Sequence, residues 1–283
     1  MSSSLRLGIS FMAAYAVLQA LIWAIVRGLG NELSTETLFF FRNLIGVITL
    51  SPMLFKHGRG LFETQRFMTH FWRALASGAG ALTLYYAVEH APLGTVVAIT
   101  FAAPIFASLV AILFYKEPAT VAKLFALGLG FMGASFVARP SMAGDLSGIV
   151  AAFIGAIATA AAFLLVKTLA TTEKAPTVVA LPFFILLPIS AIIAAFNWTT
   201  PEVHHILPLL GIGVGFSAVQ YAMAKAFHYA EASAVLPIDY LRLIAASAIG
   251  TLYFGDAINA WVFAGALLIL SASVITVRQK RSA

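Results

Sequence analysis

The chain contains no cysteine, and only 10% of its 283 residues are Asp, Glu, Lys or Arg. The absence of cysteine excludes disulfides and thiolate-bound metals. A soluble domain carries about 25% charged residues, so this chain has too little charge to cover a water-exposed surface. Instead, 61% of its residues are hydrophobic and its mean hydropathy is +0.96. This composition indicates a protein that is solvated largely by lipid.

Long segments lack formal charge altogether, namely 7–26, 90–115, 146–166, 175–201, 203–224 and 257–277. Each is close to or above the roughly 18 to 20 residues that cross a bilayer as a helix. Pro, Gly and charge clusters mark the boundaries between spans. The sequence therefore predicts an all-α polytopic membrane protein with ten transmembrane helices. We place them near 7–27, 34–55, 70–88, 93–115, 119–138, 146–168, 177–197, 206–227, 232–254 and 258–277.

The Lys and Arg residues lie mainly on one side of this topology. With the N-terminus inside, Arg27 and Arg139 lie outside and Arg42 and Arg242 lie within spans. Cytoplasmic loops of membrane proteins carry an excess of positive charge. We therefore expect a multi-pass protein of the bacterial inner (plasma) membrane with both termini cytoplasmic, and no nucleic-acid partner. The thirteen cytoplasmic residues are Arg6, Lys56, Arg59, Arg66, Arg73, Lys116, Lys123, Lys167, Lys174, Lys225, Arg278, Lys280 and Arg281.

The two halves of the chain are similar when they are compared at an offset of 139 residues. Segment 87–118 aligns without a gap on 226–257, and Glu117 then meets Asp256. The first span aligns with the sixth at an offset of 140, which pairs Arg27 with Lys167. These offsets predict two repeats, residues 1–141 and 142–283. Because each repeat has five spans, the second must be inverted relative to the first, as in many transporters.

Short motifs occupy corresponding places in the two halves. They are FAAPIF (101–106) followed by YKEP (115–118), and DYLRL (239–243) followed by YFGD (253–256). With these motifs and the repeat, the chain resembles the EamA-type branch of the drug/metabolite transporter superfamily. Two departures are Asp256, where the family more often has Glu, and Leu243 opposite Pro104. Within the family the chain looks most like bacterial exporters of aromatic amino acids.

Asp239 and Arg242 are the only charges between Glu231 and Asp256. An ionisable group at mid-helix costs about 2.5–3.5 kcal/mol to insert, so neither should face lipid. Their i, i+3 spacing puts them on one helix face. Three interpretations follow: a salt bridge that holds the helix in place, a pair that binds a zwitterion, or proton coupling at Asp239. Arg42, near the outer end of its span, is expected to reach the headgroups with its long stem.

Polar and aromatic side chains within the spans are further candidates for a substrate site. Tyr15, Gln19 and Trp23 recur every four residues and share a helix face, although an interfacial position is an alternative for Trp23. Thr159 and Phe163 repeat this stripe at an offset of 140. The complete set of predicted substrate-binding residues is Tyr15, Gln19, Trp23, Tyr85, Thr100, Phe101, Thr159, Phe163, Gln220, Tyr221, Asp239, Tyr240 and Arg242.

The predicted function is secondary transport, with export of neutral, aromatic or large apolar amino acids by alternating access around a central cavity between the repeats. The alternative is uptake of a larger metabolite such as S-adenosylmethionine. An intramembrane enzyme would need a second acid near Asp239. A small-multidrug-type cation exchanger would need an acid within residues 7–26, which contain none.

No cofactor or metal is expected. GLGFMG (128–133) lies inside an apolar span, where close helix packing explains it better than a dinucleotide site. His204 and His205 are adjacent rather than four residues apart, as helical metal ligands are. Glu117 and Asp256 lie at span ends, where capping or interfacial roles are expected. The expected partners are a small-molecule substrate and membrane lipid, and the protein is a monomer or a homodimer.

Overall fold

The structure is a computed structural model that describes residues 3–52, 58–103, 106, 121, 125, 128–130, 132–133, 136, 145–170, 172–173, 175–229, 238–239, 241–257 and 260–279. Within these residues all regular structure is helical, which confirms the predicted all-α class. The α-helices are α1 (Ser3–Leu29), α2 (Thr35–Thr49), α4 (Phe67–His90), α5 (Leu93–Thr100), α8 (Leu146–Ala170), α9 (Ala175–Phe196), α10 (Ile206–Tyr229), α12 (Leu241–Phe254) and α13 (Ala260–Gln279). The 3₁₀ helices are η1 (Gly58–Leu61) and η2 (Val203–His205).

The helices lie where hydropathy places them. Among the described residues, four helical segments are long and apolar enough to cross a membrane: 4–29, 146–166, 176–196 and 203–223. Residues 241–254 and 260–272 form shorter apolar helices. Every predicted span except 119–138 overlaps a described helix. Most of 119–138 lies outside the described residues, so the count of ten spans stays a prediction.

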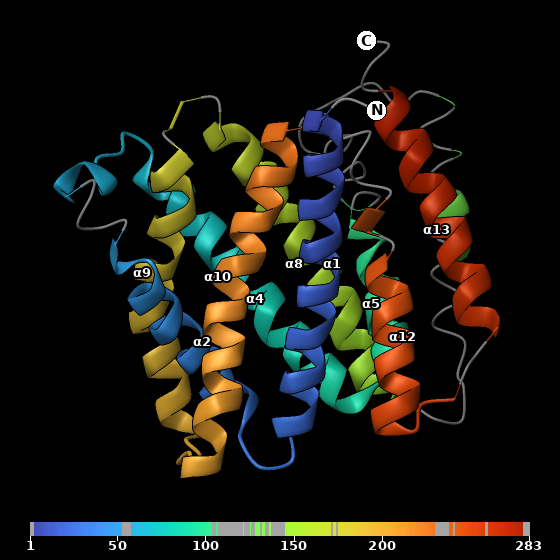
Figure 1. Cartoon of the computed structure of the whole chain (residues 1–283), viewed down its shortest axis with the longest axis horizontal. Coiled ribbons are helices and arrows are strands. Elements are labelled where there is room, and N and C mark those ends of the chain that lie inside the picture. Colours follow the sequence, from blue (N-terminus) through green and yellow to red (C-terminus); the bar gives the residue numbers. More distant parts are fainter. Residues whose placement is uncertain are drawn as a thin grey trace.

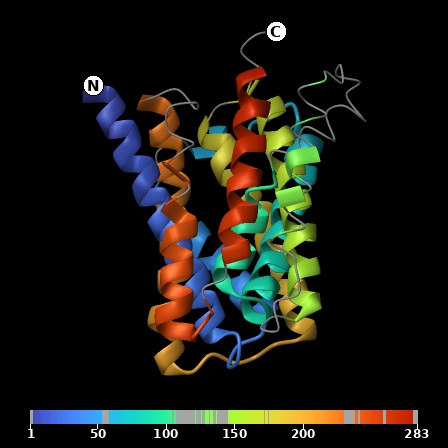
Figure 2. The same cartoon turned by 90° about the vertical axis from the view of Figure 1, so that its right-hand side faces the viewer.

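The beginning of α1 and the end of α13 lie at the same end of the bundle (Figures 1 and 2). We call this the proximal end and the opposite one the distal end. The link between α1 and α2 and the link between α9 and α10 both lie at the distal end. The side of the membrane that this end faces stays a prediction.

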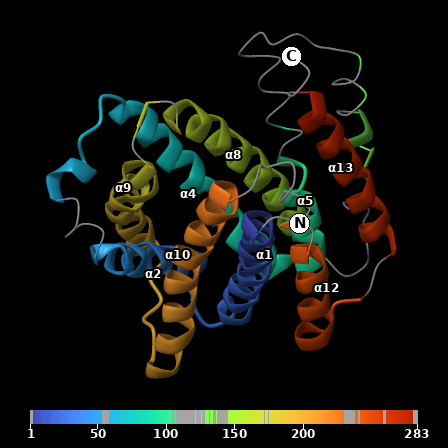
Figure 3. The ribbon, with the colours of Figure 1, turned by 45° about the horizontal axis from the view of Figure 1, so that its top comes forward.

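Helices of the first half pack mainly against helices of the second half. Helix α4 lies along α8, and α1 lies along α10; α2 contacts α9 and α10, while α5 contacts α8 and α12 (Figure 3). The repeat pairs α1 with α8, α4 with α10, and α5 with α12. If each helix is replaced by its partner, the contact between α4 and α8 becomes the contact between α10 and α1. In the same way, the contact between α1 and α12 becomes the contact between α8 and α5. Both members of each pair of contacts are present, as a two-repeat arrangement requires.

Small residues allow the closest of these approaches. A Cβ atom added at Gly211 or Gly215 of α10 would lie 3.4 Å or 3.3 Å from the side chains of Ile25 and Ile22 of α1. At Gly133 it would lie 2.7 Å from the carbonyl oxygen of Gly265 in α13. These glycines allow close helix packing, and Gly133 belongs to the segment for which this was expected.

An ion pair ties the two halves together at the distal end. Arg27, in the last turn of α1, donates to both carboxylate oxygens of Asp256, at 2.6 Å and 2.8 Å. The backbone N–H of Leu93, the first residue of α5, donates to Asp256 Oδ2 at 3.0 Å. The guanidinium of Arg27 also lies 4.4 Å from the ring centroid of Phe254. Asp256 thus joins α1, α5 and the end of α12.

Candidate functional site

The charge pair of the second half lies inside the bundle. Arg242 Nη2 donates to Asp239 Oδ2 at 2.9 Å, and the two side chains are only 10% and 15% exposed. Twelve helical residues separate Arg242 from the distal end of α12 at Phe254, or about 18 Å at 1.5 Å per residue. A hydrocarbon core is about 30 Å thick, so the pair lies near mid-depth.

The hydrogen bond between Asp239 and Arg242 leaves other polar atoms of the two side chains unpaired among the described residues. Asp239 Oδ1 and Arg242 Nε are buried without a hydrogen-bond partner in the described part of the chain. Buried polar atoms are normally satisfied, because an unpaired one loses its hydration without compensation. An oppositely charged pair with one free acceptor and one free donor can bind the ammonium and the carboxylate of a zwitterion.

Aromatic rings from two other helices enclose this pair. The guanidinium carbon of Arg242 lies 5.5 Å from the ring centroid of Trp23 and 4.8 Å from that of Phe101. Both rings are buried, so Trp23 takes the interior position rather than the interfacial alternative. Tyr15, half-buried on α1, and Ile238 both pack against Met12 and Ala226. Cation–π contacts stabilise a buried guanidinium, and the flat rings offer a stacking surface.

A second cation, Arg42 of α2, corrects the expectation that this side chain reaches the headgroups. Arg42 is 4% exposed, and its Nε is buried without a hydrogen-bond partner among the described residues. Its guanidinium carbon lies 4.2 Å from the ring centroid of Phe216, 5.1 Å from Phe39 and 5.9 Å from Tyr85. No described carboxylate pairs with it. The position of a residue along a helix predicts its depth in the membrane but not which way its side chain points. Arg42 lies on the face of α2 that is turned toward the interior of the bundle.

The structure brings only some of the predicted residues to these two cations. Tyr85 contacts Arg42, while Trp23, Phe101 and Asp239 contact Arg242. Gln19 is buried on α1. The hydroxyl of Thr100 bonds to its own helix at Val97, at 2.7 Å.

Other predicted residues lie elsewhere. Thr159 lies against Gly80 between α8 and α4. Gln220 is half-buried on α10, and Tyr221 is 60% exposed and lies edge-on to Phe11. Tyr240 and the side chain of Phe163 lie outside the described residues.

A separate hollow of about 430 Å³ lies at the distal end, between the beginning of α2 and the ends of α4 and α9. Its lining includes Thr35, Glu36, Glu89, His90 and Asn197 but neither charge of the mid-depth pair. The hollow is therefore distinct from the site at Arg242.

Proteins of known function resemble this chain over nearly its whole length. A riboflavin transporter of Brucella anthropi is 29% identical over 276 residues, covering 94% of this chain and 95% of the relative. An S-adenosylmethionine uptake transporter of Rickettsia felis is 24% identical, covering 90% and 87%. A pseudopaline exporter of Pseudomonas aeruginosa is 23% identical, covering 94% and 95%.

The fold also matches a solved crystal structure. That structure superposes with a TM-score of 0.61 at 14% identity and covers 100% of this chain and 99% of the other. At this identity the match establishes the fold alone. The family model described as "EamA-like transporter family" matches the chain twice, over residues 6–139 and 146–278. The chain is therefore a membrane transporter and belongs to the EamA-like transporter family.

Proposed function

We propose that the chain takes up a metabolite that joins an amino-acid head group to a planar heteroaromatic ring, as S-adenosylmethionine does. One observation carries the proposal: Asp239 and Arg242 form a buried pair in which one acceptor and one donor have no partner among the described residues, next to the rings of Trp23 and Phe101. The pair suits the zwitterionic head group, and the rings suit the base. A largely apolar pocket with a few polar anchors is typical of small-molecule sites.

The second cation favours a substrate larger than a free amino acid. Arg42 offers a buried guanidinium without a carboxylate partner in the described part of the chain. It belongs to the group of α2, α4 and α10, whereas Arg242 lies beside α1 and the end of α5. Helix α1 contacts α4 and α10 of the first group as well as α12. A substrate that reaches both groups contacts the two halves at once. Alternating access then follows if one half rocks against the other around the bound substrate.

Relatives that carry heteroaromatic compounds support the ring-binding part of this proposal. Two of them are named as transporters of riboflavin and of S-adenosylmethionine. Riboflavin has a planar ring system but no zwitterionic head group. The charge pair at Asp239 and Arg242 therefore favours the second of these substrate types.

Export of large neutral or aromatic amino acids is the second candidate. The same unpaired atoms of Asp239 and Arg242 favour it, because a free amino acid carries the same head group. Its side chain would stack on Trp23 or Phe101 without reaching Arg42.

We further propose that the proximal end faces the cytoplasm. Thirteen of the Lys and Arg residues belong to the predicted cytoplasmic side, which includes both termini. The chain has no cysteine, so single cysteines at the exposed loop positions Gln65 and Thr200 can report sidedness without further changes. In intact cells an impermeant maleimide should label Thr200→Cys and not Gln65→Cys. The reverse pattern would invert the assigned orientation.

Counterflow in proteoliposomes tests the substrate. Separate vesicles are loaded with unlabelled S-adenosylmethionine, riboflavin or phenylalanine, and entry of the same compound in labelled form is measured with the other two as competitors. We expect accumulation of labelled S-adenosylmethionine. If phenylalanine exchanges and S-adenosylmethionine does not, the amino-acid exporter replaces the proposal. If only riboflavin exchanges, the zwitterion site is wrong.

Substitutions test the roles of the charges. Asp239→Asn removes the charge that would bind the ammonium, and we expect at least a tenfold loss of S-adenosylmethionine exchange, since each factor of ten corresponds to about 1.4 kcal/mol. Arg42→Gln should also reduce exchange. Asp145→Asn, at an exposed loop position, is the matched control and should leave it unchanged. Normal exchange in Asp239→Asn, with protein folded as judged by its thermal transition, would rule out the anchor.

A further inference from the structure

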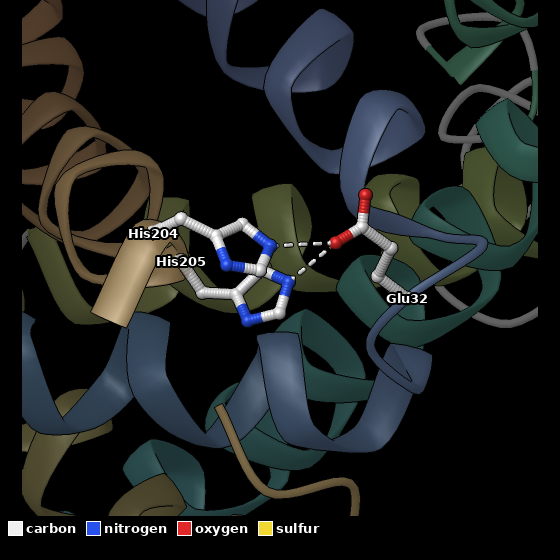
Figure 4. Close-up of side chains that lie close together, drawn as sticks. All are labelled: Glu32, His204 and His205. Atoms are coloured by element: carbon white, nitrogen blue, oxygen red, sulfur yellow. Dashed lines mark hydrogen bonds and ion pairs between the residues drawn. The ribbon is translucent and has the colours of Figure 1, made fainter. Parts of the chain in front are cut away.

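A cluster of three metal-binding side chains lies at the distal end, far from the charge pair in the bundle. Glu32, in the link between α1 and α2, accepts hydrogen bonds from both histidines of η2 at the same oxygen (Figure 4). The distances from Glu32 Oε2 are 2.9 Å to His204 Nε2 and 2.7 Å to His205 Nε2. One potential ligand atom from each residue lies within 4.8 Å of the others.

Neighbouring groups orient the two imidazoles toward Glu32. The Glu202 carboxylate lies 3.6 Å from His204 Nδ1, on the side of the ring away from Glu32. The Glu202 backbone N–H donates to His205 Nδ1 at 2.9 Å. A carboxylate behind a histidine is a common arrangement in metal sites, because it orients the ring and strengthens the nitrogen as a ligand.

Charge and access also suit a cation. The Glu32 carboxylate accepts from both imidazoles and supplies the negative charge of the cluster. Glu32 and His204 are 51% and 59% exposed, whereas His205 is 4% exposed. An ion can therefore reach the cluster from water and keep a water ligand on its open side.

We propose that Glu32, His204 and His205 form a binding site for a divalent transition-metal ion of the zinc type. Two imidazoles and one carboxylate are the protein ligands of several zinc sites, with water in the fourth position. Imidazole nitrogen favours Zn²⁺, Ni²⁺ and Cu²⁺, while Mg²⁺ and Ca²⁺ prefer sites made only of oxygen. Ligands about 2.0–2.2 Å from a tetrahedral ion lie about 3.3–3.6 Å apart. The two distances from Glu32 Oε2, 2.9 Å and 2.7 Å, must therefore lengthen by about 0.4–0.9 Å, which an exposed carboxylate can allow.

Metal binding replaces the hydrogen bonds between Glu32 and the two histidines with bonds from the three side chains to the ion. The ion replaces the proton that each histidine shares with Glu32, and metal affinity therefore falls at acidic pH. In His205 the proton must move to Nδ1, so the bond from the Glu202 backbone is lost. The Glu202 N–H and the His205 Nδ1–H would then face each other, so the ring or the peptide must turn. A buried donor left unpaired lowers affinity by about 5- to 150-fold, which weakens the site without removing it.

The bound ion would join the two repeats. Glu32 belongs to the first half and the histidines to the second, 172 and 173 residues away. A related contact lies at the proximal end, where Thr64 Oγ1 donates to Glu173 Oε1 at 2.7 Å. Thr64 precedes His204 by 140 residues, and Glu173 follows Glu32 by 141, so the two contacts are repeat equivalents. Only the distal contact contains histidine, and so only that end acquires a metal link.

Zn²⁺ binding is tested by titrating the ion into the whole purified chain. The affinity tag used for purification must contain no histidine. Isothermal calorimetry should give one site per chain at neutral pH. Glu32→Gln and His204→Ala, both at exposed positions, should each weaken binding at least tenfold. Glu173→Gln, in the proximal equivalent, is the matched control and should bind as the parent does. Lack of saturable binding, or binding that Glu32→Gln and His204→Ala leave unchanged, would overturn the site.

The effect of the ion on transport is measured separately, and this part alone rests on the proposed function. If the link restrains the halves, Zn²⁺ should slow exchange in the parent and not in His204→Ala. Binding without any effect on exchange would overturn the restraint. Calorimetry needs no transported substrate, so failure of the metal site and failure of the substrate assignment give different results.

Discussion

Removing the charge of Asp256 should destabilise the protein by breaking the distal ion pair. Arg27 and Asp256 are 16% and 11% exposed and make two hydrogen bonds. The change Asp256→Asn keeps the size of the side chain and an oxygen that can accept from Leu93, so it isolates the charge. Arg27 is then left mostly buried without its carboxylate.

The magnitude follows from the burial of the pair. Breaking a buried ion pair by removing one partner costs about 3–5 kcal/mol. The pair is not fully buried, so we take about 3 kcal/mol. For a chain of this size each kcal/mol lowers the melting temperature by about 2–4 °C, and the expected drop is about 6–12 °C. Arg27→Gln should cause a similar drop.

Thermal unfolding in lipid nanodiscs, followed by circular dichroism, measures the effect. Once one partner is gone, loss of the other should cost little, so Arg27→Gln combined with Asp256→Asn should melt near the single variants. Arg66→Gln removes an exposed arginine and controls for net charge. The reasoning fails if Asp256→Asn melts with the parent, or if the two losses simply add.

Two further predictions concern packing and pH. A Cβ added at Gly213 would lie 2.4 Å from Cβ of Ile45, so Gly213→Ala should lower the free energy of unfolding by about 1–3 kcal/mol. Gly28→Ala is the control, because nothing lies within 4 Å of a Cβ added there. It should leave the melting temperature unchanged or raise it. Hydrogen bonds from the hydroxyl and backbone N–H of Ser147 lower the pKa of Asp145, so its contribution to stability is present at neutral pH and is lost as the pH falls through the lowered pKa. Acid titration of the melting temperature should show a shallower decline in Asp145→Asn, and an unchanged curve would refute this role.

Most of the secondary structure could be predicted because lipid imposes a simple rule on the sequence. A backbone without water must form helices, so uncharged segments of sufficient length identify them. Helix starts were also readable. Ser34 was near a predicted boundary, and its hydroxyl accepts from the backbone N–H of Thr37 at 3.3 Å as the N-cap of α2. Helix ends were harder to read: α2 ends at Thr49, whereas the predicted span continues to 55, and residues 53–55 lie outside the described residues.

The candidate site was only partly predictable. The i, i+3 spacing of Asp239 and Arg242 gave their pairing, because that contact is local to one chain segment. Arg42 was missed because hydropathy reports how deep a residue lies and not which neighbours it faces. Its contacts, Tyr85 and Phe216, come from helices brought together by tertiary packing.

The distal cluster was missed for a related reason. Sequence spacing treats His204 and His205 as an isolated pair, whereas the third ligand belongs to a loop of the other half. The offset between repeats could have suggested the neighbourhood, since it aligns these loops with Thr64 and Glu173, but not the hydrogen bonds.

The interleaving of the two halves also has a consequence for biosynthesis. Arg27 is made 229 residues before Asp256, which at about 5–20 residues per second is a delay of about 10–45 s. During that time α1 lacks α10 and α12, two of the helices it packs against. The early helices must therefore wait in the membrane, with their inward faces covered by lipid or by an insertion factor. If translation stops before α8, we expect membrane proteases to degrade the first half, because the helices that it packs against are missing.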